Sequence, residues 1–156
     1  MTDLCKFKDP FDDEIGPLIR KVLKLWQRIG HKHLGGLGLT ISQLEIMGAI
    51  VALKCEDKEV TQIALSHETN IDPMTTSTIL RNLQKKGLIT RKESETDTRA
   101  RAVELTEAGE KILIEAGEKI NILYKKLGSD RMDKKRVKIK LTALYRKLNN
   151  LYNELQ

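Results

Sequence analysis

The segment from Asp72 to Gly109 constrains the fold more than any other part of this 156-residue chain. Asp72 is a favourable N-cap, and Pro73 suits the first helical position because an N–H there would have no helical partner. Two lysines precede Gly87, and cations suit the last turn of a helix, whereas glycine commonly ends one. We therefore predict a helix that begins at Pro73 and ends before Gly87.

This predicted helix has an apolar side and a polar side. At about 100° per residue, the inward side consists of Thr76, Ile79, Leu80 and Leu83. The opposite side, with Thr75 and Asn82 at its flanks, carries Met74, Ser77, Thr78, Arg81 and Lys85. Small hydroxyl residues allow close approach to base edges, and Arg81 can reach a guanine or a phosphate. An ordinary surface helix has the same pattern, so the helix alone leaves both interpretations open.

Two short β-forming runs follow the helix, Leu88–Arg91 and Ala102–Leu105, with a polar segment between them. Arg99 and Arg101 are two residues apart and therefore point the same way on an extended strand. An arginine at a hairpin tip can enter a narrow minor groove, and Asp97 can hold the Arg99 guanidinium in a bidentate pair. A solvated hairpin tip is the alternative. A helix followed by a charged hairpin is typical of a winged helix-turn-helix facing DNA.

Helices are also predicted before this segment. Apolar residues recur at spacings of three and four from residue 12 to residue 29 and predict a first helix. After a glycine-rich break at residues 35–38, a second helix begins near Thr40 or Ser42. Its apolar face is predicted to bury Leu44, Met47, Ile50 and Val51.

A short third helix begins within Val60–Leu65. Thr61 and Gln62 lie at its start, where backbone N–H groups can hold a phosphate. A simple helix cap would use the same two residues, so this position has two interpretations.

The last third of the chain carries a leucine seam on each of two consecutive helices, separated by a break at Gly128–Ser129. The seams consist of Gly109, Leu113, Ala116, Ile120, Leu123 and Leu127, then Val137, Leu141, Leu144, Leu148, Leu151 and Leu155. A lone helix hairpin of this length has little surface to pack against. We therefore expect a twofold dimer with interlocked terminal helices; a monomeric three-helix core is the alternative.

The hairpin sequence D-T-R-A-R-A-V-E-L-T-E-A-G, residues 97–109, resembles the wing signature of the MarR family of bacterial transcription regulators. In that signature an acidic residue and arginines precede V-x-L-T-x-x-G. Residues 71–89 resemble the family's recognition helix, although Pro73 and Met74 stand where the family often has a basic or small polar residue. The similarity extends over nearly the whole chain.

The resemblance implies a mainly α fold with a small β-hairpin wing (α+β), a winged helix-turn-helix with N- and C-terminal dimerisation helices. We predict a single domain, 1–156, with dimerisation helices at 11–34 and 107–156. The DNA-binding lobe is predicted at 40–106.

In function, the resemblance implies a sequence-specific regulator of transcription that binds double-stranded DNA at a pseudo-palindromic operator and usually represses. The predicted DNA contacts are Thr61, Gln62, Met74, Thr75, Ser77, Thr78, Arg81, Arg91, Asp97, Arg99 and Arg101. Members of the family release DNA when a small, often phenolic or anionic, effector binds between the dimer and DNA-binding lobes. This implies an effector site that involves Trp26, His33 and Met47.

Composition narrows the function classes. A net charge of +6 and a pI near 9.3 favour an acidic polymer as partner, and 4% aromatic residues argue against base-stacking RNA or single-strand platforms. We expect a cytoplasmic protein without membrane contact, since no long apolar run or secretory signal is seen. No phosphate loop, H-E-x-x-H or Ser-His-Asp pattern indicates an enzyme, and no cofactor is expected. A winged-helix protein-interaction module is a competing class, which would not need Arg99 and Arg101 on one edge.

The cysteines and histidines bear on three further kinds of site: a disulfide, a redox sensor and a metal site. Cys5 and Cys55 are distant in the sequence, and a structural disulfide is not expected in a cytoplasmic protein. Neighbouring lysines lower a thiol pKa, so a redox-sensing regulator acting through Cys5 is an alternative. His31 and His33 form H-x-H, but no Cys or Glu set accompanies them, and no metal site is predicted.

Overall fold

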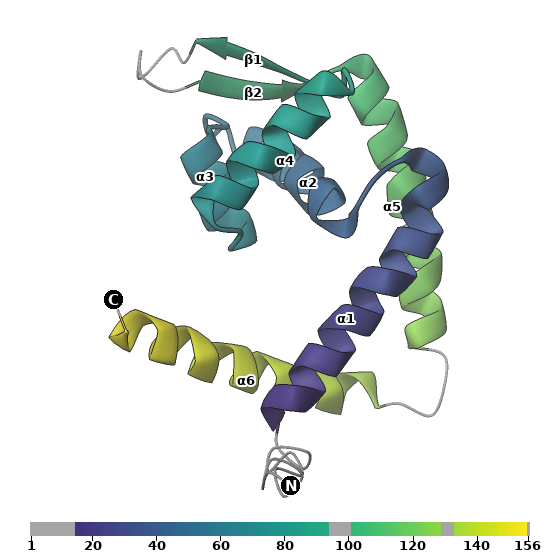
Figure 1. Cartoon of the computed structure of the whole chain (residues 1–156), viewed down its shortest axis with the longest axis vertical. Coiled ribbons are helices and arrows are strands. Elements are labelled where there is room, and N and C mark those ends of the chain that lie inside the picture. Colours follow the sequence, from purple (N-terminus) through teal and green to yellow (C-terminus); the bar gives the residue numbers. More distant parts are fainter. Residues whose placement is uncertain (1–14, 94–100, 129–132, 156) are drawn as a thin grey trace, which may run out of the picture. The chain divides into compact units, whose positions relative to one another are not determined.

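The computed structural model describes residues 15–93, 101–128 and 133–155, which form six α-helices, one 3₁₀ helix and two strands (Figure 1). In chain order these are α1 (Ile15–Leu34), η2 (Gly35–Leu37), α2 (Ile41–Cys55), α3 (Gln62–Thr69), α4 (Pro73–Lys85), β1 (Ile89–Glu93), β2 (Arg101–Leu105), α5 (Glu107–Leu127) and α6 (Lys134–Glu154). This is the predicted α+β class. The chain divides into two compact units, residues 1–119 and 120–156, which are described separately.

The core of the first unit lies among α2, α3, α4 and the hairpin. The inward row predicted for α4 is confirmed, since all four of its side chains are buried. On α2, Met47 and Ile50 are buried as predicted and Leu44 is half-buried, but Val51 is 40% exposed. The prediction for Val51 was wrong because α2 is apolar on most sides, and Ile46 and Leu53 fill the core instead.

The ends of α2 and α4 follow from local sequence. Thr40 and Gln43 form a reciprocal capping box, each side chain accepting the other's backbone N–H at 3.2 Å. At the end of α4, Gly87 adopts φ +69°, which glycine tolerates at no steric cost. The N–H of Leu88 then donates to the Leu83 carbonyl at 3.0 Å, and this turn sends the chain directly into β1.

β1 and β2 form an antiparallel hairpin in which Ile89 pairs with Leu105 and Arg91 pairs with Val103. A third backbone segment, absent from the sequence prediction, extends this sheet. The N–H of Val103 donates to the Val60 carbonyl at 2.8 Å, and Thr61 bridges to Ala102. The base of the hairpin is therefore tied to the start of α3.

Thr106 fixes the hairpin to α5. Its hydroxyl donates to the Gly87 carbonyl at 2.7 Å and accepts the Gly109 N–H at 3.0 Å. Its own N–H donates to the Leu88 carbonyl at 3.0 Å. Gly109 allows this approach, because a Cβ at that position would lie 2.1 Å from the Leu88 oxygen.

This contact predicts opposite effects for two glycines of the same helix. Gly109→Ala is expected to lower the free energy of unfolding by about 1–3 kcal/mol, since backbone must move to admit the methyl group. Gly117→Ala is the matched control: no atom lies within 4 Å of its added Cβ, so helix propensity should stabilise it by up to about 1 kcal/mol. Urea denaturation measures both. Equal values for the two variants would contradict the tight approach.

Several apolar residues of the terminal helices are exposed in the single chain. In the first unit, Ile15, Leu18, Val22 and Leu23 of α1 are 51–63% exposed. In the second unit, α6 has no buried residue, and Leu141, Leu148, Leu151 and Leu155 of its predicted seam are 47–86% exposed.

Within the described ranges, no single helix is long and apolar enough to cross a membrane. Residues 15–37 and 41–55 reach that length and composition only together, across a bend of 73°. The second of these segments is α2, which supplies much of the buried core.

Candidate nucleic-acid interface

The polar side predicted for α4 faces solvent. Met74 is 82% exposed, Thr75, Thr78 and Arg81 are also exposed, and Ser77 is half-buried. The Thr78 hydroxyl donates to the Met74 carbonyl at 3.1 Å, and Arg81 Nη2 donates to the Thr78 hydroxyl oxygen at 3.2 Å. The guanidinium of Arg81 is thereby held along the helix.

The amino terminus of α4 is closed by Asp72. Its carboxylate accepts the Thr75 N–H at 2.9 Å. Hydrogen bonds from the side chain and backbone of Thr75 lower the pKa of Asp72, so its carboxylate stays ionised at neutral pH. A negative charge at this position also complements the helix dipole.

α3 and the turn that follows it hold the beginning of α4. Thr61 caps α3 by accepting the Ala64 N–H at 3.2 Å. The Gln62 side-chain amide donates to the Pro73 carbonyl at 3.3 Å. In the turn, the hydroxyl of Ser66 donates to the Ile71 carbonyl at 2.7 Å. The cap is thus observed at Thr61, and a phosphate contact by Thr61 or Gln62 stays a prediction.

Arg91 lies half-buried on the strand face that it shares with Arg101. Its Nε and Nη2 atoms are buried, and no described residue offers either of them a hydrogen-bond partner. Burial lowers the pKa of Arg91, and the positive charges of Arg101 and Arg81 lower it further. The charges of Arg81 on α4 and Arg101 on β2 therefore both act on Arg91 of β1, at the junction of helix and hairpin. We call Arg81, Arg91 and Arg101 the arginine cluster.

The other face of the hairpin is electrostatically different. Lys92 Nζ lies 2.8 Å from Glu104 Oε2, and both side chains are largely exposed. The hydrogen bond between them raises the pKa of Lys92 and lowers that of Glu104. Lys92 is thus already paired, unlike Arg91.

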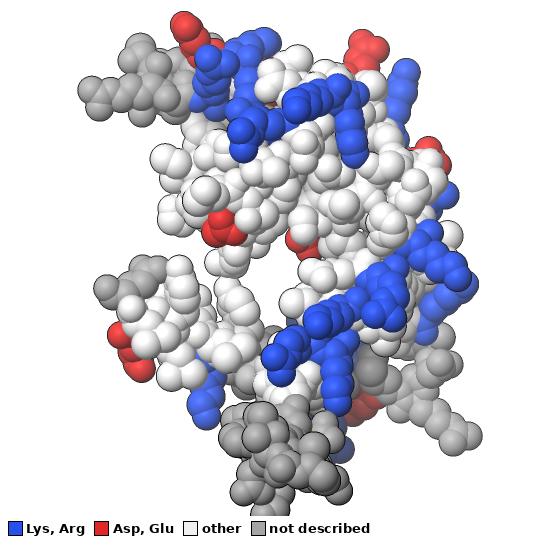
Figure 2. Space-filling model, viewed as in Figure 1, with Lys and Arg blue, Asp and Glu red and all other residues white. Residues whose placement is uncertain are grey.

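Positive charge gathers at one place on this surface. Figure 2 shows Lys and Arg side chains over the hairpin and the carboxyl end of α4, whereas they do not gather near the beginning of α4. The basic residues on these elements are Arg81, Lys85, Arg91, Lys92 and Arg101. Asp97 and Arg99 lie outside the described residues, and their roles stay predictions.

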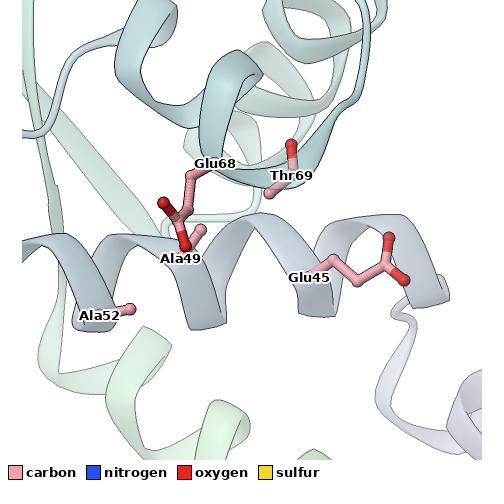
Figure 3. Close-up of a pocket in the computed structure, with 5 residues that line it drawn as sticks. All are labelled: Glu45, Ala49, Ala52, Glu68 and Thr69. Atoms are coloured by element: carbon pink, nitrogen blue, oxygen red, sulfur yellow. The ribbon is translucent and has the colours of Figure 1, made fainter. Parts of the chain in front are cut away.

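The predicted effector residues have different surroundings. Met47 is fully buried in the core, and Trp26 and His33 on α1 are half-buried. The Nδ1 atom of His33 lies 3.1 Å from the Ile29 carbonyl. A pocket of about 320 Å³ lies elsewhere, between α2 and the end of α3 (Figure 3), and is lined by Glu45, Ala49, Ala52, Glu68 and Thr69. Partial burial raises the pKa of Glu45. The effector assignment remains a prediction.

Among the residues with described positions, no group of three or more His, Cys, Asp and Glu side chains is arranged to hold a metal ion. Cys55 is a free thiol exposed at the end of α2. Cys5 lies outside the described residues, and its proposed redox role stays an alternative.

The winged arrangement of α3, α4 and hairpin can be compared with known proteins. The family model for transcriptional regulators of the SarA/Rot type matches residues 28–116, from the end of α1 into α5. The chain belongs to the SarA/Rot family. This is a MarR-like winged-helix family, so the resemblance to MarR regulators is confirmed. As a SarA/Rot family transcriptional regulator the protein is not an enzyme, as predicted.

One relative and two solved structures are also similar to this chain. This SarA/Rot family member is 32% identical over 104 residues to the uncharacterised HTH-type transcriptional regulator YdcH of Bacillus subtilis, covering 67% of this chain and 70% of YdcH. The MepR–DNA complex of S. aureus aligns with a TM-score of 0.72 and 22% identity over 95% of this chain and 99% of MepR. A MarR variant from E. coli, complexed with operator DNA, aligns with a TM-score of 0.73 and 24% identity over 90% and 98% of the two chains. These structures establish the winged-helix fold.

Proposed function

We propose that this SarA/Rot family regulator binds double-stranded DNA, with α4 in the major groove and the hairpin at the adjacent minor groove. The observation that carries the proposal is the arginine cluster. Buried guanidinium nitrogens without partners, surrounded by like charges, cost folding free energy unless an anion satisfies them. A backbone phosphate supplies both the charge and the acceptor oxygens.

The position of the cluster supports the same function. It lies at the end of the exposed face of α4, so that a phosphate held there would place that face along the base edges. Proteins of the same fold, MepR and MosR among them, have been solved in complex with DNA. In this arrangement Arg99, Arg101 and Asp97 belong to the minor-groove contact.

We also propose that the binding unit is a homodimer. The leucines of α6 and the apolar residues of α1 are 47–86% exposed in the single chain, and contiguous exposed apolar side chains of this kind mark interaction surfaces. A second copy of the chain covers identical surfaces by twofold symmetry. Two α4 helices would then read the half-sites of a pseudo-palindromic operator, spaced by about one helical turn, roughly 34 Å.

We further propose that the protein represses transcription in the cytoplasm and that a small phenolic or anionic effector relieves this repression. Trp26, His33 and Met47 are the proposed effector residues. Such an effector releases DNA only if it binds more tightly to a spacing of the two DNA-binding lobes that the operator does not fit. Isothermal titration of candidate phenolic acids, with and without operator, would detect this coupling.

Salt dependence tests the central proposal. If the dimer neutralises about six phosphates, affinity for duplex DNA should fall by roughly 10³-fold between 50 and 200 mM salt. Fluorescence anisotropy with labelled genomic fragments measures this slope. A protein-interaction module would instead show weak binding and a flat salt response, and that result would overturn the proposal.

A further inference from the structure

The first turn of α4 has few hydrogen-bond donors left for DNA. Pro73 has no N–H, and the Thr75 N–H donates to the Asp72 carboxylate at 2.9 Å. The Thr76 N–H donates to the Asp72 carbonyl at 2.9 Å. This helix terminus is therefore largely satisfied internally, and the ionised Asp72 disfavours a phosphate there.

The side chains of this region are occupied in the same way. The hydroxyl of Thr78 donates to the Met74 carbonyl at 3.1 Å. The Thr78 hydroxyl oxygen also accepts a hydrogen bond from Arg81 Nη2 at 3.2 Å, so this hydroxyl group acts as both donor and acceptor. The group of Thr78 that remains for an external partner is mainly its methyl group.

Met74 is a large apolar side chain at the exposed start of the helix. Its side chain is 82% exposed. A thioether chain this exposed has no role in the core and is flexible enough to fit a small apolar partner. In the major groove, the 5-methyl group of thymine is the apolar feature of the base edges.

We propose that the amino-terminal half of α4 reads a thymine 5-methyl group through Met74 and Thr78, while Arg81, further along the helix, belongs to the phosphate-binding arginine cluster. This proposal rests on the proposed function, because it assumes that α4 enters the major groove. It makes Met74 a specificity-determining residue, although its position departs from the basic or small polar residue common among MarR regulators.

The test begins with selection of a bound duplex from a randomised pool by the full-length protein. In that duplex each thymidine is replaced in turn by deoxyuridine, which lacks only the 5-methyl group. At one position of each half-site we expect about a fourfold loss of affinity, and roughly fifteenfold when both half-sites are changed. Deoxycytidine at that position should bind more weakly than 5-methyldeoxycytidine by a similar factor.

Protein variants assign the effect to Met74. Met74→Ala should reduce the thymidine-to-deoxyuridine ratio at that position to below about twofold, whereas Met74→Leu should retain it. Ile63→Ala removes another exposed apolar side chain, on α3, and should leave the ratio unchanged, because the first helix of such a motif crosses the backbone. Since Met74 and Ile63 are both exposed, thermal melting of the variants should match that of the parent protein.

The outcomes separate this inference from the proposed function. Duplex binding that is insensitive to deoxyuridine everywhere, or a ratio that survives Met74→Ala, would overturn the thymine contact and leave DNA binding intact. Failure to bind any duplex would overturn both.

Discussion

Arg91→Met is expected to weaken binding to duplex DNA by about 10- to 100-fold for each half-site while making the folded protein more stable. A hydrogen bond between a charged guanidinium and a phosphate contributes about 1.5–3 kcal/mol, which sets the loss of affinity. The unbound protein holds Nε and Nη2 of Arg91 buried without partners, beside Arg81 and Arg101. Methionine keeps an unbranched chain but removes that charge, so the free energy of unfolding should rise by about 1 kcal/mol.

Lys92→Met is the matched control. Lys92 is the next residue of the same strand, carries the same charge and is already paired with Glu104 at 2.8 Å. Its replacement should change affinity by less than about threefold. Anisotropy titrations at fixed salt and urea denaturation measure the two quantities. If Arg91→Met lost stability and kept its affinity, Arg91 would be a structural residue and not a phosphate contact.

Charges placed on the α6 seam are expected to separate the proposed dimer. In the variant Leu141→Asp with Leu148→Asp, a dimer would bury four carboxylates where leucines packed. Burial of each leucine contributes about 1.5–3 kcal/mol, so dissociation should become more favourable by over 100-fold. Both leucines are about half exposed in the single chain, and the monomer should therefore stay helical.

Asn149→Asp controls for added charge, because Asn149 is an exposed polar residue adjacent to Leu148 on the same helix. Sedimentation velocity should show monomers for the double variant and dimers for the control. Circular dichroism should show equal helix content. The monomeric three-helix alternative would be favoured by an unchanged sedimentation coefficient in both proteins.

Much of the lobe could be predicted because its signals are local. Asp72 and Gly87 mark the ends of α4, and a period of 3.6 residues separates its buried row from its exposed face. Val51 shows where periodicity fails: on a helix that is apolar on most sides, only the neighbouring elements decide which side is covered. The strand contact from Val60 was missed because one bridged residue pair has no sequence signature, apart from two β-branched residues.

The sequence by itself determined the helices, the hairpin and the residues at the exposed face of α4, since caps, glycines and periodicity act over a few neighbouring residues. Only the tertiary structure decided the electrostatic state of those residues. It brings Arg81 of α4 to Arg91 and Arg101 of the hairpin, and it closes the start of α4 with Asp72. Charge interaction and burial depend on distances between elements. For this reason only the folded structure distinguishes two parts of the Asp72–Gly109 segment. One part is suited to a phosphate, and the other is suited to an apolar base edge.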